Sequence, residues 1–196
     1  MTFLPGNRRK SRERGATIVE AAIIVPLLLL MVIAIMEYGL AFKDYLTVSY
    51  LSREGARLGA LAGDSDTADC DILTGLADLI TPGDLARIDY IEIYEADQSS
   101  GNQGATNRAT YTDPNDPNVC TEPSGGQPGD GWSITPIGGG YPTGSRNTAA
   151  SPTTPLDIIG VRVVLTRSWI TGFGPFSGTA TVDETTITRM EPEVFG

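Results

Sequence analysis

The chain has 196 residues, a net charge of −10 and no histidine. An acidic chain repels nucleic acid, and without histidine the commonest general base and the commonest metal ligand are missing. No phosphate-binding loop or paired-cysteine zinc pattern is present, so we expect no nucleic-acid partner, no enzymatic activity, no catalytic residue, no cofactor and no metal site.

Residues 1–15 form a short basic leader. It holds five of the 14 basic residues of the chain and one acidic residue. Lys and Arg gather on the cytoplasmic side of membrane helices. The leader therefore predicts a cytoplasmic N-terminus, and an extracytoplasmic C-terminal domain if a membrane helix follows.

An apolar run follows the leader, from Ala16 to Met36. As a helix its 21 residues would span ~31 Å, close to the ~30 Å hydrocarbon core of a bilayer. We predict a single transmembrane helix over residues 16–37, with the bilayer as partner. Glu20 is the only charged residue in the run, and a carboxylate costs roughly 2.5–3.5 kcal/mol at the centre of a membrane helix. This cost suggests that Glu20 has a function.

The position of Glu20 relative to the leader suggests what that function is. If the chain is cut after Gly15, Ala16 becomes the new N-terminus and Glu20 becomes the fifth residue. The new ammonium group and the carboxylate then lie one helical turn apart, and they can pair within one subunit or between subunits.

The helix is expected to continue beyond the membrane over residues 38–63. Residues spaced alternately by three and four form a stripe that is apolar except for Asp44. Gly55 and Gly59 are four residues apart, and small residues at this spacing allow another element to approach the helix closely. We expect both glycines to pack against the domain of the chain itself or against a neighbouring subunit, and Gly63 to end the helix.

Residues 64–196 predict an α+β domain. Acidic residues at 64–71 precede apolar residues at helical spacing, which favours a short helix that ends at Pro82-Gly83. Alternating apolar residues predict strands at 88–94, 158–169 and 178–190.

The segment between the first two of these strands, residues 97–157, is rich in Gly, Pro, Ser, Thr and Asn. This composition predicts a long irregular loop. The expected architecture is therefore a long helix packed on a small antiparallel sheet of three or four strands, with a loop-rich insertion.

Cys70 and Cys120 are the only cysteines, and both lie on the predicted oxidising side of the membrane. We expect them to form a disulfide. Two acidic segments, 64–71 and 113–116, are more typical of a helix N-terminus and of turns capped by Asx side chains, respectively. Calcium binding is the alternative for both.

Several of these features together resemble a known family. The leader and its junction are similar to the processing site of type IV prepilins. The chain resembles the TadE-like family more closely, through Arg14-Gly15-Ala16-Thr17-Ile18-Val19-Glu20-Ala21-Ala22, Pro26-Leu27-Leu28-Leu29-Leu30, Glu37-Tyr38-Gly39, Arg53-Glu54-Gly55-Ala56-Arg57 and, more weakly, Thr188-Arg189-Met190-Glu191-Pro192.

The resemblance implies a minor pilin or pseudopilin of the tight-adherence (Flp) pilus. Its implied partners are a prepilin peptidase, other pilins and the membrane proteins of Tad assembly. Gly15 and Ala16 would flank the cleaved bond, and Glu20 would act in subunit assembly.

Other functions are compatible with the same sequence. The chain could remain unprocessed, as a single-pass membrane protein with an extracytoplasmic binding domain whose ligand surface is the loop-rich insertion. The apolar run could be a secretory signal peptide cut before Phe42, although it is longer than the usual ~7–15 residues. The insertion could also act as an adhesin at the tip of a pilus.

Overall fold

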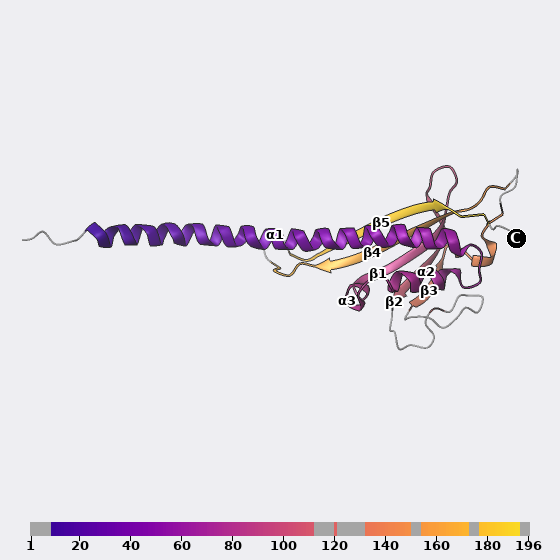
Figure 1. The fold of residues 1–196 in the computed structure, drawn as a ribbon, viewed down its shortest axis with the longest axis horizontal. Helices are drawn as coiled ribbons and strands as arrows, with labels where there is room; N and C mark the ends of the chain where they lie inside the picture. Colours follow the sequence, from indigo (N-terminus) through magenta and orange to yellow (C-terminus); the bar gives the residue numbers. More distant parts are fainter. Residues whose placement is uncertain (1–8, 112–119, 121–131, 150–153, 173–176, 193–196) are drawn as a thin grey trace, which may run out of the picture.

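The computed structural model describes residues 9–111, 120, 132–149, 154–172 and 177–192. Its dominant element is the helix α1, Arg9–Ala62, which is continuous over 54 residues and contains Pro26. At ~1.5 Å per residue, α1 is ~81 Å long. Its N-terminal half projects from the rest of the chain as a stalk (Figure 1).

The ends of α1 follow from local sequence. We expected a helix from Ala16, but α1 begins at Arg9, inside the leader. The leader residues after Arg9 include Lys, Arg and Glu, which are good helix formers, and no proline interrupts them. At the other end, Gly63 has a φ of 62°. This left-handed conformation is easily adopted by glycine, and it ends the helix as expected.

The β-strands of the described residues form one antiparallel sheet in the order β3-β2-β1-β4-β5. The strands are β1 Ile88–Ala96, β2 Gln103–Tyr111, β3 Trp132–Ile137, β4 Ile158–Ser168 and β5 Thr179–Arg189. Strands β1, β4 and β5 confirm the predicted segments, and the α+β class is confirmed.

The sheet has five strands rather than three or four. The two additional strands, β2 and β3, lie within residues 97–157, for which we expected only irregular structure. That expectation was wrong because β2 is built from Thr, Asn, Arg and small residues and lacks an apolar alternation. β3 contains Pro136, which an edge strand tolerates.

The C-terminal half of α1 lies along the sheet (Figure 1), and the helix α2, Ala68–Ala77, packs beside it. The helix that we expected to end at Pro82-Gly83 is thus shorter, because α2 ends at Ala77 and a separate one-turn helix α3, Pro82–Leu85, follows it. A short 3-10 helix spans Thr143–Ser145. The core between the helices and the sheet contains Val48, Leu51, Ile72, Leu73, Leu76, Ile91, Ile93, Ile159, Val161 and Val163, all fully or almost fully buried.

Glycines allow α1 to approach the sheet closely. A Cβ atom added to Gly55 would lie 2.9 Å from Cγ1 of Val161, and one added to Gly59 would lie 2.7 Å from Cδ1 of Ile159. Both glycines therefore occupy positions where α1 touches β4 and where a side chain would force neighbouring atoms to move.

Candidate functional site

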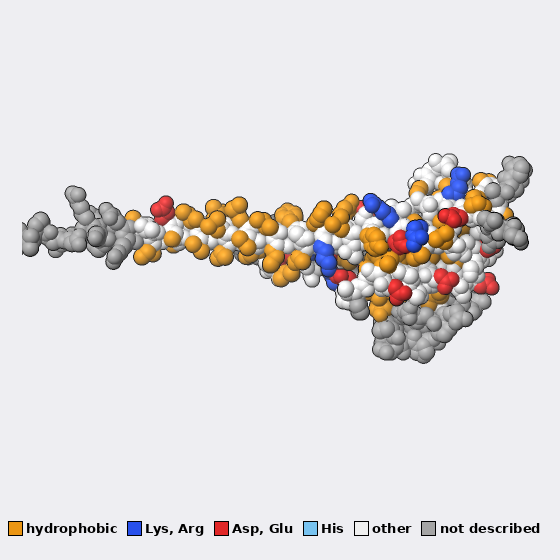
Figure 2. Space-filling model, viewed as in Figure 1, with side chains coloured by type: hydrophobic (Ala, Val, Ile, Leu, Met, Phe, Trp, Pro, Cys, Tyr) orange, Lys and Arg blue, Asp and Glu red, His pale blue; other side chains and the backbone are white. Residues whose placement is uncertain are grey.

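The N-terminal half of α1 is the most unusual surface of the molecule. Among the described residues, one helix is long and apolar enough to cross a membrane, and its most apolar stretch has a mean hydropathy of 2.9. No residue of that stretch is buried within the chain, and Figure 2 shows hydrophobic side chains along this half of the helix. Exposed apolar surface of this extent requires lipid or other protein to cover it.

The predicted processing junction lies within this helix. Gly15, Ala16 and Glu20 are all exposed, and Ala16 and Glu20 are one helical turn apart on α1. A Cβ atom added to Gly15 would meet nothing within 4 Å. Since a glycine inside a helix costs ~1 kcal/mol relative to alanine, Gly15 weakens the helix without serving a packing contact among the described residues.

Burial of α1 begins with a charged residue. Glu37 follows the last residue of the apolar run, and its side chain is fully buried. Its carboxylate accepts hydrogen bonds from Nη2 of Arg167 at 3.2 Å and from the backbone N–H and the hydroxyl of Thr171 at 2.8 and 3.0 Å. Because Arg167 lies on β4, this contact joins α1 to the end of the domain from which the apolar half of α1 projects.

Asp44, two turns further along α1, extends this contact into a network. Its carboxylate is 3.3 Å from Nη1 of Arg167 and accepts two hydrogen bonds from Arg87, at 2.7 and 3.0 Å. Arg87 also reaches Asp84, whose carboxylate accepts hydrogen bonds from Lys43. We call these six residues the neck cluster: Glu37, Lys43, Asp44, Asp84, Arg87 and Arg167.

The neck cluster contains three acids and three bases, so its formal charges balance. The hydrogen bond from Lys43 is the main cause that lowers the pKa of Asp84, and the hydrogen bond to Asp44 raises the pKa of Arg87. A buried ion pair is costly to form, but removing one partner leaves an uncompensated charge and is strongly destabilising. The neck cluster therefore fixes the position of the domain on the helix.

A cavity of about 370 Å³ adjoins the neck cluster at the same end of the domain. It is lined by side chains of α1, of β4 and the residues after it, and of the segment before β1: Leu40, Lys43, Asp44, Arg87, Thr166, Arg167, Ser168 and Ile170. The cavity thus opens beside the point where the helix leaves the domain.

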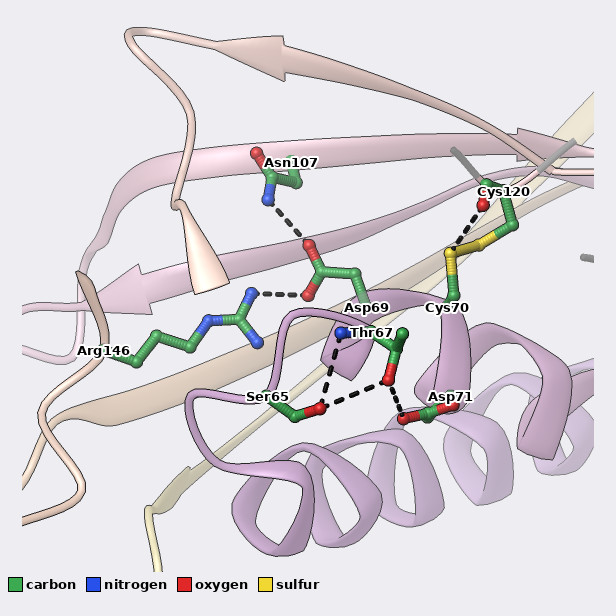
Figure 3. The surroundings of a disulfide bond; sticks show 8 residues. All are labelled: Ser65, Thr67, Asp69, Cys70, Asp71, Asn107, Cys120 and Arg146. Atoms are coloured by element: carbon green, nitrogen blue, oxygen red, sulfur yellow. Dashed lines mark hydrogen bonds and ion pairs between the residues drawn. A yellow bond between two sulfur atoms is a disulfide. The ribbon is translucent and has the colours of Figure 1, made fainter. Parts of the chain in front are cut away.

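A second buried cluster lies at the other end of the domain, beside the disulfide (Figure 3). Cys70 and Cys120 are bonded, which attaches α2 to a residue 50 positions later. Next to Cys70, the buried carboxylate of Asp69 accepts hydrogen bonds from Arg146 and, at 2.7 Å, from Asn107. These contacts join α2 to β2 and to the segment after β3, so they stabilise the part of the domain that is poor in apolar residues.

In the described acidic segment, residues 64–71, the carboxylates do not form a cation site. Asp69 pairs with Arg146, and Asp71 accepts a hydrogen bond from Thr67 at 2.8 Å. In the described ranges no group of three His, Cys, Asp or Glu side chains could hold a metal ion. The segment 113–116 lies outside the described residues.

Sequence reasoning did not identify the neck cluster. In the sequence analysis Glu37 is named only as part of a motif that resembles the family, and Arg167 lies only within a predicted strand. The signal that could have revealed the cluster was Asp44, the single polar residue in the stripe of α1 that faces the domain. A carboxylate on a buried helix face requires a cationic partner, and Arg87 and Arg167 supply it.

Comparison with known proteins bears on the same helix. Residues 15–57 match the family model described as TadE-like protein. No curated protein and no solved structure matches the chain. The match begins at Gly15, includes Glu20, Glu37 and Asp44, and ends shortly after Gly55. Residues 15–57 are therefore similar to the TadE-like family, which confirms the resemblance that the sequence motifs indicated.

Proposed function

We propose that this protein is a minor pilin or pseudopilin that a prepilin peptidase processes between Gly15 and Ala16. It acts in assembly of a tight-adherence type surface pilus used for adhesion. One observation carries the proposal: Glu20 is the single carboxylate in the apolar run Ala16–Met36, which lies within the TadE-like match and which no other described residue buries.

Before assembly, the apolar helix lies in the bilayer with the basic leader in the cytoplasm and residues 38–196 outside. Cleavage removes the leader and creates the Ala16 ammonium group. The helix then exchanges lipid for the helices of other pilins, so that the same apolar side chains stay out of water. In that bundle Glu20 pairs with the Ala16 ammonium of a neighbour.

The pairing would set the register of neighbouring subunits. A carboxylate buried without a partner is strongly unfavourable, whereas a paired one is tolerated. Only the axial offset that brings Glu20 to a neighbouring N-terminus satisfies the carboxylate. An added Cβ atom at Gly15 would meet no described atom within 4 Å, so packing does not account for a glycine at this position. In this proposal, the glycine is required for recognition by the peptidase.

Replacement of Glu20 tests this function. In cells that carry the peptidase and the other pilus proteins, Glu20→Gln should be cleaved normally but should be lost from complexes that co-purify with pilins. Glu54→Gln is the matched control, since Glu54 is an α1 carboxylate that pairs with Arg57 in the same chain. Normal assembly of Glu20→Gln would contradict the proposed pairing.

A second candidate is a single-pass membrane protein that keeps its leader and carries an extracytoplasmic binding domain. The continuity of α1 through Gly15 and Ala16 favours it, because a peptidase needs an unwound substrate at the bond that it cuts. In this case Glu20→Gln would leave ligand binding by the domain unchanged, and the leader would stay attached in the presence of the peptidase.

A further inference from the structure

The position of the neck cluster along α1 places one edge of the domain at the membrane surface. The apolar run Ala16–Met36 is as long as the hydrocarbon core is thick, and Glu37 follows it directly. The backbone N–H of Thr171 donates to Glu37 at 2.8 Å. Thr171 therefore lies level with the end of the apolar run, where lipid tails meet headgroups.

The residues at that level have the chemistry of a membrane interface. Ile170 precedes Thr171 and is 65% exposed, and Tyr38, the neighbour of Glu37, is 64% exposed. Trp169 is only partly buried, and the guanidinium of Arg167 lies 4.9 Å from the centre of its ring. Tyr and Trp are enriched at membrane–water interfaces because one part of each side chain is apolar and another is polar.

The fold directs these residues towards the membrane. The β4 strand ends at Ser168, so Trp169 and Ile170 lie at the end of the domain from which the N-terminal half of α1 projects (Figure 1). The neck cluster holds this end of β4 against α1. This end of β4 cannot move away from α1, and so from the membrane surface, without breaking the buried ion pairs of Arg167.

We propose that Trp169 and Ile170 form a second membrane contact, in which both side chains insert into the outer interface beside the transmembrane helix. The protein is then held at two points, which fixes the tilt of α1 and the direction in which the domain faces. The contact is apolar, because the charges of the neck cluster balance each other. We therefore expect it to form equally on neutral and on anionic lipid.

The proposal rests on the apolar helix spanning a bilayer and not on cleavage or pilus assembly. A protein that keeps its leader, or that fails to assemble, should still show the contact. Resistance of the protein to extraction from vesicles at high pH tests the spanning helix separately.

The two tryptophans allow a direct test. Trp132 is fully buried in the core, and Trp169 is the only other tryptophan. The full chain carrying Trp132→Phe is placed in phosphatidylcholine vesicles whose acyl chains are brominated at a shallow or a deep position. We expect shallow bromines to quench Trp169 strongly and deep bromines to quench it weakly. The chain carrying Trp169→Phe, which retains Trp132, should be quenched by neither.

A second test introduces a charge at Ile170, one of the two residues proposed to insert into the interface. Ile170→Asp should remove most of the quenching of Trp169, whereas Ile187→Asp should not. Ile187 is a matched control, since it is 46% exposed and lies at the other end of the domain, where β5 pairs with the start of β4. If Trp132→Phe fails to fold, the difference in quenching between the wild-type chain and Trp169→Phe reports the same contact.

Three results would overturn the proposal: quenching of Trp169 no stronger than that of Trp132, equal quenching after Ile170→Asp, or quenching that appears only when anionic lipid is added. The last result would indicate headgroup binding by the basic side chains in place of apolar insertion.

Discussion

Replacing Arg167 tests whether the neck cluster joins the domain to the helix. Arg167 contacts both Glu37 and Asp44, and all three side chains are at most 5% exposed. Arg167→Met keeps most of the side-chain volume but leaves two buried carboxylates with one cationic partner, Arg87. Removal of one partner of a buried ion pair costs about 3–5 kcal/mol. The loss would be a large part of the ~5–15 kcal/mol by which folded domains are stable.

The loss can be measured on the full chain in detergent by pulse proteolysis in urea, which reports the unfolded fraction without relying on the tryptophan next to Arg167. Arg57→Met is the control. Arg57 has a 60% exposed side chain and pairs with Glu54, and because exposed ion pairs contribute little, its loss should destabilise the domain far less than Arg167→Met does. The double variant Glu37→Met/Arg167→Met should recover part of the stability, because it removes the unpaired charge. Equal effects of Arg167→Met and Arg57→Met would refute this account of the neck cluster.

Further predictions concern the stability of the domain and the packing of α1. Gly59→Ala should lower the free energy of unfolding in urea by about 1–2 kcal/mol, since the steric cost at Ile159 exceeds the gain in helix propensity. Gly39→Ala is the control, because an added Cβ atom there meets no described atom within 4 Å and should not lower the stability. Reduction of the Cys70–Cys120 disulfide should lower the free energy of unfolding by about 2–4 kcal/mol, measured with and without reductant. The pKa of Asp84 is lowered from its usual 3.8, so its contribution to stability is present above that value and is lost as the pH falls through the lower folded pKa. Asp84→Asn should therefore make the unfolding free energy less dependent on pH below about 4, compared with the wild-type chain.

The long helix and three of the strands could be predicted from sequence because their signals are local. An apolar run of 21 residues next to basic residues is a strong pattern, and Val161, Val163 and Leu165 alternate clearly in β4. The disulfide could be predicted because the chain has only two cysteines and both were expected on the oxidising side of the membrane.

The strands β2 and β3 could not be predicted in this way, because distant partners stabilise them. Arg108 of β2 donates to Glu92 of β1 at 2.7 Å, and Asn107 donates to Asp69 of α2. These polar contacts take the place of an apolar pattern. In the same way, Arg167 meets Glu37 across 130 positions, a separation at which sequence spacing carries no information.

The mass of the protein extracted from membranes tests the central claim most directly. Intact mass spectrometry should be carried out on the chain produced with and without a prepilin peptidase in the same host. Our account predicts a peptidase-dependent loss of residues 1–15, so that the mature chain begins at Ala16. Retention of the leader when the peptidase is present would contradict the pilin function and favour the unprocessed membrane protein. A chain that begins at Phe42 would indicate a secreted protein instead.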